Sequence, residues 1–407
     1  MIVQKISHKS KNLQADSEFE FFDRSICELP CFSIVNEDED LACFDDPELQ
    51  PWIALDNFIV FGTGGSSLCG QCLQVLSSSK NNKSIAFVDN IDPSSIEKVL
   101  SAIDLSTTGF LFISKSGETL ETLAQLILLL QKITSEITVE ENVSEFITSR
   151  IVVITENKKS SIRTIAQENN MTCLDHPNNI GGRFSAFSIV GMLPALLLGI
   201  DPQRIRKGGR NVLQHGLDAV KSGSSFVAQN AMQGISQHVS FFYSDNLATF
   251  GKWLAQLYAE STGKSERGIT PLTAMGSVDQ HSQLQLYLDG PHDKCFTFFF
   301  EKQNNDICIK DILVPSSFDY LKNKKIADIF EAQCNATISC IEEKNISVRK
   351  IEIDTLTPEI IGAMFMHFML EVVCVCKALT VNPFDQPSVE KGKIITKNLL
   401  EELRYEN

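Results

Sequence analysis

Short apolar runs alternate with helical patterns through the first half of the chain. The runs predict strands, and the apolar periodicity between them predicts helices. The expected strands are 58–61, 84–88, 110–113 and 151–154, and the expected helices are 66–76, 93–103, 119–133 and 161–168. Because these strands are apolar throughout, they indicate a doubly wound parallel sheet that is covered by helices on both faces.

The second half of the chain predicts another α/β unit. Helical patterns fill 202–237, followed by expected strands at 240–243, 296–300 and 348–353 and expected helices at 247–261 and 359–378. The predicted fold class is therefore α/β, with two doubly wound parallel-sheet domains of three layers (αβα). We divide the chain into an N-terminal arm (1–50), a first domain (51–190), a second domain (191–380) and a C-terminal loop and helix (381–407).

Two turns rich in glycine and hydroxyls follow expected strands, where ligands of parallel sheets bind. They are Gly62–Ser67 (GTGGSS) and Ser114–Thr119 (SKSGET). Hydroxyls and N–H groups at a helix start can hold a phosphate without magnesium. An ordinary helix cap at Ser116 is the simpler alternative. A dinucleotide site, supported by Asp89, is another, but G-x-G-x-x-G requires glycine where the chain has Ser67.

A carboxylate and a histidine stand in the stretch 256–287. Glu260 lies in an expected helix, and His281 follows in the polar sequence DQHS. They form a general acid/base pair if the fold brings them together, and otherwise belong to a charged surface helix and a polar loop. The GKS tripeptide resembles the end of a P-loop, but Tyr258 stands where that motif needs glycine. Arg183, beside two glycines, is either a cleft residue or a surface arginine at a turn.

Composition excludes some functions. The chain has 407 residues and a formal net charge of −15, which argues against general binding of nucleic acid or anionic membranes. Its twelve cysteines and the lack of a signal-peptide pattern predict reduced thiols and a cytoplasmic protein. Cys69 and Cys72 have redox or zinc spacing without a second pair, so packing roles are expected. The apolar run 189–200 is too short to span a bilayer.

Six segments together resemble the phosphoglucose isomerase (glucose-6-phosphate isomerase) family. They are GTGGSS at 62–67, ISKSGETLET at 113–122, GGRFS at 181–185, YAESTGK at 258–264, DQHSQLQ at 279–285 and NPFDQPSVEKGK at 382–393. They occur in the family's order and span nearly the whole chain, and the DQHS and NPFDQP forms look like the bacterial branch. The resemblance implies two sugar-isomerase (SIS) domains and a C-terminal helix that completes the active site.

The resemblance also implies an activity: the reversible aldose–ketose isomerisation of glucose 6-phosphate and fructose 6-phosphate through a cis-enediol, in glycolysis and gluconeogenesis. Glu260 matches the base that moves a proton between C2 and C1, and Arg183 matches the arginine beside the developing enediolate. His281 matches the histidine that assists ring opening, and Lys393 matches the lysine of the C-terminal helix. The residues that match the substrate-binding set are Gly65, Ser66, Ser114, Lys115, Ser116, Thr119 and Gln386.

The implied partners are a small sugar phosphate and a second copy of the chain. Family members are typically dimers in which the histidine reaches the neighbouring subunit's site, so His281 is expected to do so here. No cofactor and no metal are expected, since the cis-enediol route requires neither. The chain departs from the family in its short N-terminal arm, in Cys69 where glycine is usual, and in Lys391, which leaves open whether Lys391 shares the role of Lys393.

Two other functions remain open on the sequence. A non-catalytic sugar-phosphate sensor would keep the phosphate turn, but it could lose the acid/base residues, and these are all present. An isomerase that also accepts mannose 6-phosphate would have the same motifs, and the sequence does not separate it from the first reading.

Overall fold

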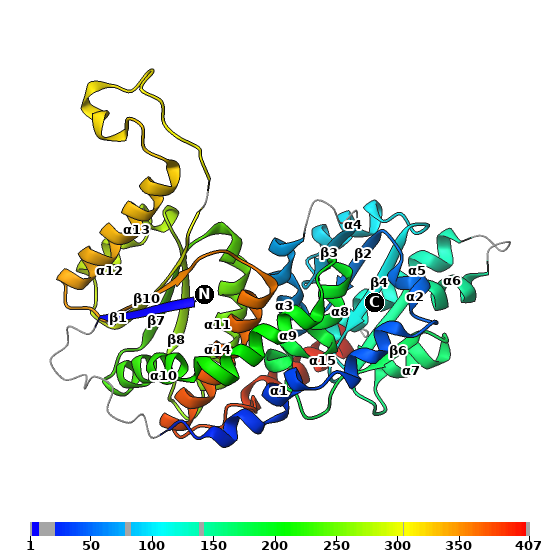
Figure 1. Cartoon of the computed structure of the whole chain (residues 1–407). Coiled ribbons are helices and arrows are strands. Elements are labelled where there is room, and N and C mark those ends of the chain that lie inside the picture. Colours follow the sequence, from blue (N-terminus) through cyan, green and yellow to red (C-terminus); the bar gives the residue numbers. More distant parts are fainter. Residues whose placement is uncertain (1, 8–20, 78–82, 138–141, 304, 404–407) are drawn as a thin grey trace.

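The computed structural model describes residues 2–7, 21–77, 83–137, 142–303 and 305–403. A loop expected from the serine run 77–79 falls largely outside these residues. Figure 1 shows two α/β lobes side by side, each built around one five-stranded sheet. The α/β prediction, with two mainly parallel sheets, is confirmed.

The first lobe contains a wholly parallel sheet in the order β3-β2-β4-β5-β6. Its strands are β2 (Asn57–Phe61), β3 (Ser84–Val88), β4 (Thr108–Ile113), β5 (Ile151–Thr155) and β6 (Thr172–Asp175). Its helices are α3 (Gly65–Leu73), α4 (Pro93–Ala102), α5 (Leu120–Glu136), α6 (Val143–Arg150) and α7 (Ser161–Glu168). Every residue of β4 and β5 is buried, as their continuous apolar sequence predicts. The four expected strands and the helices between them are confirmed, while β6 was not anticipated.

The second lobe contains a mixed sheet in the order β1-β10-β9-β7-β8. Its strands are β1 (Ile2–Ser7), β7 (Gln237–Tyr243), β8 (Thr270–Met275), β9 (Lys294–Glu301) and β10 (Val348–Ile353). β1 is antiparallel to β10, and the other pairs are parallel. β8 is a strand that was not expected from the sequence, since its segment contains Pro271 and lies between Gly268 and Gly276. A proline is tolerated there because β8 is an edge strand, which needs ladder hydrogen bonds on one side only.

The remaining helices complete the first lobe, cover the second sheet, join the two lobes or project from the body. They are α1 (Pro30–Ser33), α2 (Gln50–Ile53), α8 (Ile189–Leu197), α9 (Pro202–Asn211), α10 (Leu217–Met232), α11 (Ala248–Thr262), α12 (Leu284–Asp289), α13 (Ile326–Glu343), α14 (Pro358–Ala378) and α15 (Glu390–Glu402). Three short helical turns matter for the site: η5 (Gly182–Phe187), η8 (Val278–Gln280) and η10 (Pro387–Val389). The junction of the lobes is formed by α3 and η5 from one side and α11 from the other.

The central helix is α14, which packs against α9, α10 and α11. By length and composition alone α14 could cross a membrane, but 83% of its most apolar window is buried inside the protein. Its apolar surface is therefore covered by the chain's own core, as the central helix of a two-lobed α/β protein requires.

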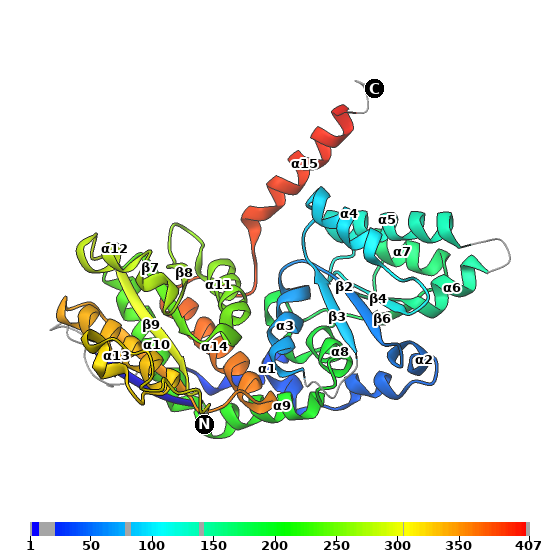
Figure 2. The same cartoon turned by 90° about the horizontal axis from the view of Figure 1, so that it is seen from above.

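The N-terminal arm contributes to this core. Phe32 and Val35 are fully buried among residues of the central cluster, and β1 extends the second sheet. Two segments instead project from the body. The segment between β9 and α13 (302–303 and 305–325), called the projecting excursion below, stands out from the second lobe in Figure 1. Helix α15 extends away from both lobes in Figure 2.

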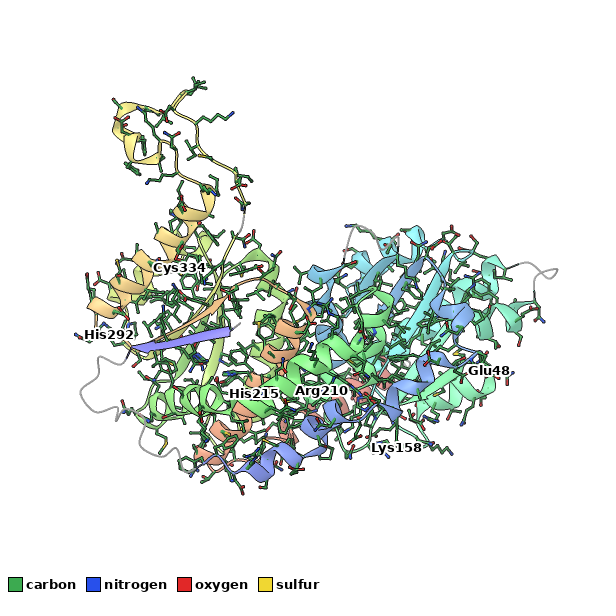
Figure 3. All side chains as sticks on the ribbon, viewed as in Figure 1. Glu48, Lys158, Arg210, His215, His292 and Cys334 are labelled. Atoms are coloured by element: carbon green, nitrogen blue, oxygen red, sulfur yellow. The ribbon has the colours of Figure 1, made fainter. Side chains whose placement is uncertain are left out.

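All twelve cysteines are free. Cys69 and Cys72 are buried on α3, and burial raises the pKa of the Cys69 thiol to about 12. Cys334, on α13, is likewise buried (Figure 3). Such thiols are inert at neutral pH, so the packing role expected for Cys69 and Cys72 agrees with their surroundings.

Candidate active site

The two predicted phosphate turns lie side by side, because β2 and β4 are neighbours and both turns follow their carboxyl ends. Gly62, the first residue of the first turn, is packed tightly against the end of β4. A Cβ there would lie 3.0 Å from Ser66 Cβ and 3.1 Å from the Ile113 carbonyl oxygen. The N-termini of α3 and α5 therefore open toward the same edge of the sheet. This edge offers N–H groups and hydroxyls to an anion.

The Ser114–Thr119 turn is held in shape by its own hydroxyls. Ser114 Oγ donates to Thr119 Oγ1 at 2.9 Å and accepts from Gly117 N at 3.2 Å. Gly117 has φ +67°, and a Cβ there would lie 2.1 Å from Ser160 Oγ, so the turn requires glycine twice over. Ser116 is exposed and its Oγ accepts from Glu118 N, which leaves its O–H free to donate to a ligand.

Lys115 supplies the positive charge of this turn. Its Nζ lies 3.6 Å from Glu156 Oε1, and Lys158 pairs with the other oxygen of the same carboxylate. Two lysines thus contact the Glu156 carboxylate, while Glu118 of the same turn accepts from Ser161 N and Oγ.

Across the junction, Glu260 and Arg183 form an ion pair, with 3.1 Å between Arg183 Nη1 and Glu260 Oε2. The side chain of Arg183 is 3% exposed and that of Glu260 32% exposed, so the carboxylate faces the opening and the guanidinium lies behind it. Glu260 stands in the last turn of α11, and Arg183 in η5. The cleft interpretation of Arg183 is therefore the one that the geometry supports.

Arg183 is surrounded by acceptors on all sides. Its Nε donates to Ser261 Oγ at 2.9 Å, Nη1 also reaches Gln386 Oε1 at 2.9 Å, and Nη2 donates to the carbonyls of Asp385 and Pro383. Burial lowers the pKa of Arg183, and the charge of Glu260 opposes that shift. The fixed guanidinium fork thus holds the 382–386 loop against α11.

Gln256 was not anticipated from the sequence, although it stands one helical turn before Glu260. Its Nε2 donates to Glu260 Oε1 at 2.8 Å. A Cβ on Gly64 would lie 2.6 Å from that same nitrogen, so the first glycine turn packs directly against Gln256. The i, i+4 spacing to Glu260 is the signal that could have found it. Through Gln256 the phosphate turns and the carboxylate belong to one cleft.

Gly65 marks the tightest contact at this junction. A Cβ on Gly65 would lie 2.2 Å from the carbonyl oxygen of Gly182 and 2.8 Å from the nitrogen of Arg183. The glycine therefore lets η5 approach the start of α3.

His281 and Lys393 stand apart from this cluster. His281 is exposed just after η8, in a loop fixed by Asp279, whose Oδ2 accepts from Met275 N at 2.7 Å. Lys393 is exposed on α15, where its Nζ pairs with Glu390 Oε1 at 2.7 Å. The structure thus brings Glu260, Arg183 and Gln386 together within one subunit and leaves His281 and Lys393 on the surface.

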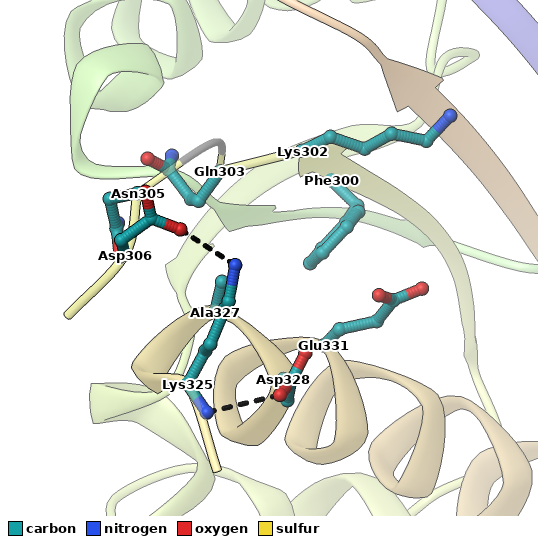
Figure 4. A pocket seen from close by; sticks show the side chains of 9 residues that line it. All are labelled: Phe300, Lys302, Gln303, Asn305, Asp306, Lys325, Ala327, Asp328 and Glu331. Atoms are coloured by element: carbon teal, nitrogen blue, oxygen red, sulfur yellow. Dashed lines mark hydrogen bonds and ion pairs between the residues drawn. The ribbon is translucent and has the colours of Figure 1, made fainter. Parts of the chain in front are cut away.

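A separate hollow of about 500 Å³ lies at the base of the projecting excursion (Figure 4). Its lining includes Lys325 and Asp306, which are paired at 2.7 Å. None of the predicted site residues lines it. Acidic side chains outnumber lysines in its lining, so it offers an anion no net positive charge and has no counterpart to the Glu260–Arg183 pair.

The chain is similar to known proteins in sequence and in fold. Residues 51–282 match the phosphoglucose isomerase family. A probable glucose-6-phosphate isomerase of Haloquadratum walsbyi is 31% identical over 370 residues, which cover 88% of this chain and 81% of that protein. A hypothetical protein of Thermus thermophilus has a similar structure, with a TM-score of 0.77, 25% identity, and coverage of 93% of this chain and 96% of that one. A glucose-6-phosphate isomerase of Chlamydia trachomatis shares the fold, with a TM-score of 0.74, 21% identity, and coverage of 91% and 74%.

The fold and the comparisons together define a two-lobed α/β isomerase. The chain belongs to the phosphoglucose isomerase family.

Proposed function

We propose that this protein interconverts glucose 6-phosphate and fructose 6-phosphate, with Glu260 as the base. The observation that carries the proposal is the Glu260 carboxylate at the cleft opening, held by Gln256 on one oxygen and by Arg183 on the other. Isomerisation removes a weakly acidic proton beside a carbonyl, and this needs a positioned carboxylate and a cationic partner for the oxyanion. Glu260 takes the proton from C2 and returns it to C1, while the positive charge of Arg183, held behind the carboxylate, stabilises the developing enediolate.

The phosphate group is assigned to the edge formed by Gly65, Ser66 and the Ser114–Thr119 turn. The hydroxyls of Ser66, Ser116 and Thr119, the Lys115 ammonium and the N-termini of α3 and α5 supply donors there, and Ser114 contributes by orienting Thr119. Binding at a group remote from the reacting carbons can provide the positioning energy for the chemical step. Gln386, which reaches Arg183, is assigned to the sugar side of the cleft.

The direct test supplies fructose 6-phosphate to the purified protein without added metal and follows glucose 6-phosphate with a coupled dehydrogenase. Glu260→Gln should bind the sugar phosphate nearly as well and lose about 10³-fold in turnover. Glu266→Gln, an exposed carboxylate just beyond α11, is the matched control and should be normal. A Glu260→Gln enzyme with a near wild-type rate would refute the assignment of Glu260 as the base.

The same assay separates the other functions. Conversion of mannose 6-phosphate alongside fructose 6-phosphate would favour a dual-specificity isomerase. Tight binding of a phosphosugar without proton exchange at C2 in deuterated water would indicate a sensor. All twelve cysteines are free, which supports the proposed cytoplasmic location.

We also propose a homodimer in which His281 and Lys393 take up their roles. His281 is already on the surface, so it is free to reach a neighbouring cleft, and α15 exposes an apolar set that a second copy would cover. That set is Ile394, Ile395, Leu399, Leu400 and Leu403. Single variants of Glu260 and His281 test the arrangement by mixing.

If His281 acts across the interface, a hybrid of Glu260→Gln and His281→Ala subunits has one intact site. Random reassociation makes half of the dimers hybrid, so about a quarter of wild-type activity should return. Activity that stays at the level of the separate variants would place His281 in its own subunit's site or outside catalysis.

A further inference from the structure

A fully buried ion pair lies in the second lobe behind the active-site helix. Arg349 on β10 and Glu371 on α14 are both 0% exposed and bind in a bidentate manner, at 2.6 and 3.0 Å. The Tyr258 hydroxyl donates to Glu371 Oε1, and His367 Nε2 lies 3.1 Å from Oε2. Desolvation costs several kcal/mol per buried ion, so such a cluster is weak evidence for stability and calls for another explanation.

The cluster has a fixed geometry. Arg349 lies between the rings of Phe226 and Phe368, at 5.5 and 5.7 Å, and its Nε donates to Thr297 Oγ1 at 3.0 Å. A Cβ on Gly223 would lie 2.1 Å from Glu371 Oε2, so α10 passes with no room to spare. Burial alone would raise the pKa of Glu371, but Arg349 and His367 lower it well below its ordinary value. The carboxylate stays ionised and immobile.

Tyr258 connects this cluster to the active site. It stands two residues before Glu260 on α11, and two residues correspond to about 200° of helix rotation, so the two side chains leave opposite faces. Tyr258 is 1% exposed and points into the lobe, whereas Glu260 points to the cleft. One face of the last turn of α11 therefore carries Glu260 toward the cleft, and the opposite face contacts Glu371 through Tyr258.

A second hydrogen bond from α14 also holds the last turn of α11. Cys376 Sγ donates to the Ser261 carbonyl at 3.3 Å, and Ser261 Oγ accepts from Arg183 Nε at 2.9 Å. α14 therefore forms hydrogen bonds with Tyr258, which precedes Glu260 in the sequence, and with Ser261, which follows it. Rotation of this turn would move Glu260 relative to Arg183.

We propose that Tyr258, bonded to the buried Arg349–Glu371 pair, is a positioning residue that sets the orientation of the catalytic carboxylate Glu260. The inference rests on the proposed role of Glu260 as the base. It also gives a reason for the buried charges. The Arg349–Glu371 pair provides a fixed acceptor for the Tyr258 hydroxyl, and this hydrogen bond holds α11 in place. A misplacement of about 1 Å at a reacting group can cost up to 10²-fold in rate, so a mount of this kind has a measurable effect.

Tyr258→Phe removes only the hydroxyl. We expect kcat to fall roughly 5- to 20-fold while KM changes less than about 2-fold, because the phosphate turns belong to the other lobe. The control is Trp52→Phe, which also loses one hydrogen bond, the partly buried bond from Nε1 to the Arg150 carbonyl at 2.9 Å. α2, which carries Trp52, lies in the first lobe away from α11 (Figure 1). The control should lower the urea midpoint comparably and leave kcat normal.

A double variant separates positioning from general damage. In a Glu260→Gln background there is no base to orient, so adding Tyr258→Phe should change the residual rate by less than about 2-fold. A full repeat of the single-variant loss in that background would overturn the inference, and so would a normal kcat in Tyr258→Phe. Failure of the proposed function would look different, since wild-type protein would then not isomerise fructose 6-phosphate or Glu260→Gln would be fully active.

Discussion

Gly65→Ala tests how closely η5 must approach the start of α3. The new Cβ would lie 2.2 Å from the Gly182 carbonyl oxygen. Real Cβ contacts are essentially never below 3.0 Å, so the two segments must separate by at least 0.8 Å, the difference between 3.0 and 2.2 Å. The atoms that the new Cβ would meet belong to the backbone of Gly182 and Arg183, so no side-chain rotation can relieve the overlap. The displaced segment carries Arg183.

We expect two consequences of this displacement. Overpacking at a rigid contact typically costs about 1–3 kcal/mol, so the urea midpoint should fall measurably. A shift of nearly 1 Å between Arg183 and Glu260 should lower kcat by about 10²-fold in the coupled isomerase assay.

The neighbouring glycine provides a matched control. A Cβ on Gly182 would meet nothing within 4 Å, so Gly182→Ala should be close to wild type in both rate and stability. A Gly65→Ala protein with normal kcat would show that the position of η5 does not govern catalysis. Equal damage from both substitutions would refute the contact argument itself.

Two further predictions concern Gln256 and His176. Gln256→Leu removes the amide that holds Glu260 Oε1 and should lower kcat about 10-fold with little change in KM, read from saturation curves. His176 is 2% exposed, and burial lowers its pKa to about 4. The unfolded chain therefore binds this proton first as the pH falls, so the stability that the neutral imidazole contributes is present above about pH 6.5 and is lost between about 6.5 and 4. This amounts to about 3 kcal/mol by pH 4. His176→Phe should flatten that part of a urea-midpoint profile, and an unchanged slope would contradict the assignment.

Strands β2, β4 and β5 of the first lobe could be predicted because they are buried nearly throughout and carry unbroken apolar runs. β8 could not, since an edge strand with Pro271 and flanking glycines has the composition of a loop. Its register is set by pairing with β7, which lies more than thirty residues earlier in the chain. β1 was missed for a similar reason: its six residues form a strand only because β10 offers an open edge.

The candidate site shows the same division. Glu260, Arg183 and Gln386 could be nominated from local motifs, but no local pattern states that one guanidinium contacts both other side chains. Gln256 lies on the same helical face as Glu260, yet glutamine at i−4 is ordinary on a surface helix. Only the packing of Gly64 against it gives it a place in the cleft.

The acidity of the chain does not oppose the binding of a doubly charged sugar phosphate. At physiological ionic strength, exposed charges more than about 8 Å apart are largely screened, so the total of −15 matters less than the charges beside the turn. There, the charges of Lys115 and Lys158 balance those of Glu156, which both lysines contact, and Glu118, which Ser161 binds, so these four groups carry no net negative charge. The N-termini of α3 and α5 add partial positive charges at the same edge. The phosphate therefore meets a local attraction, and the Glu260 carboxylate, already paired with Arg183, adds little repulsion.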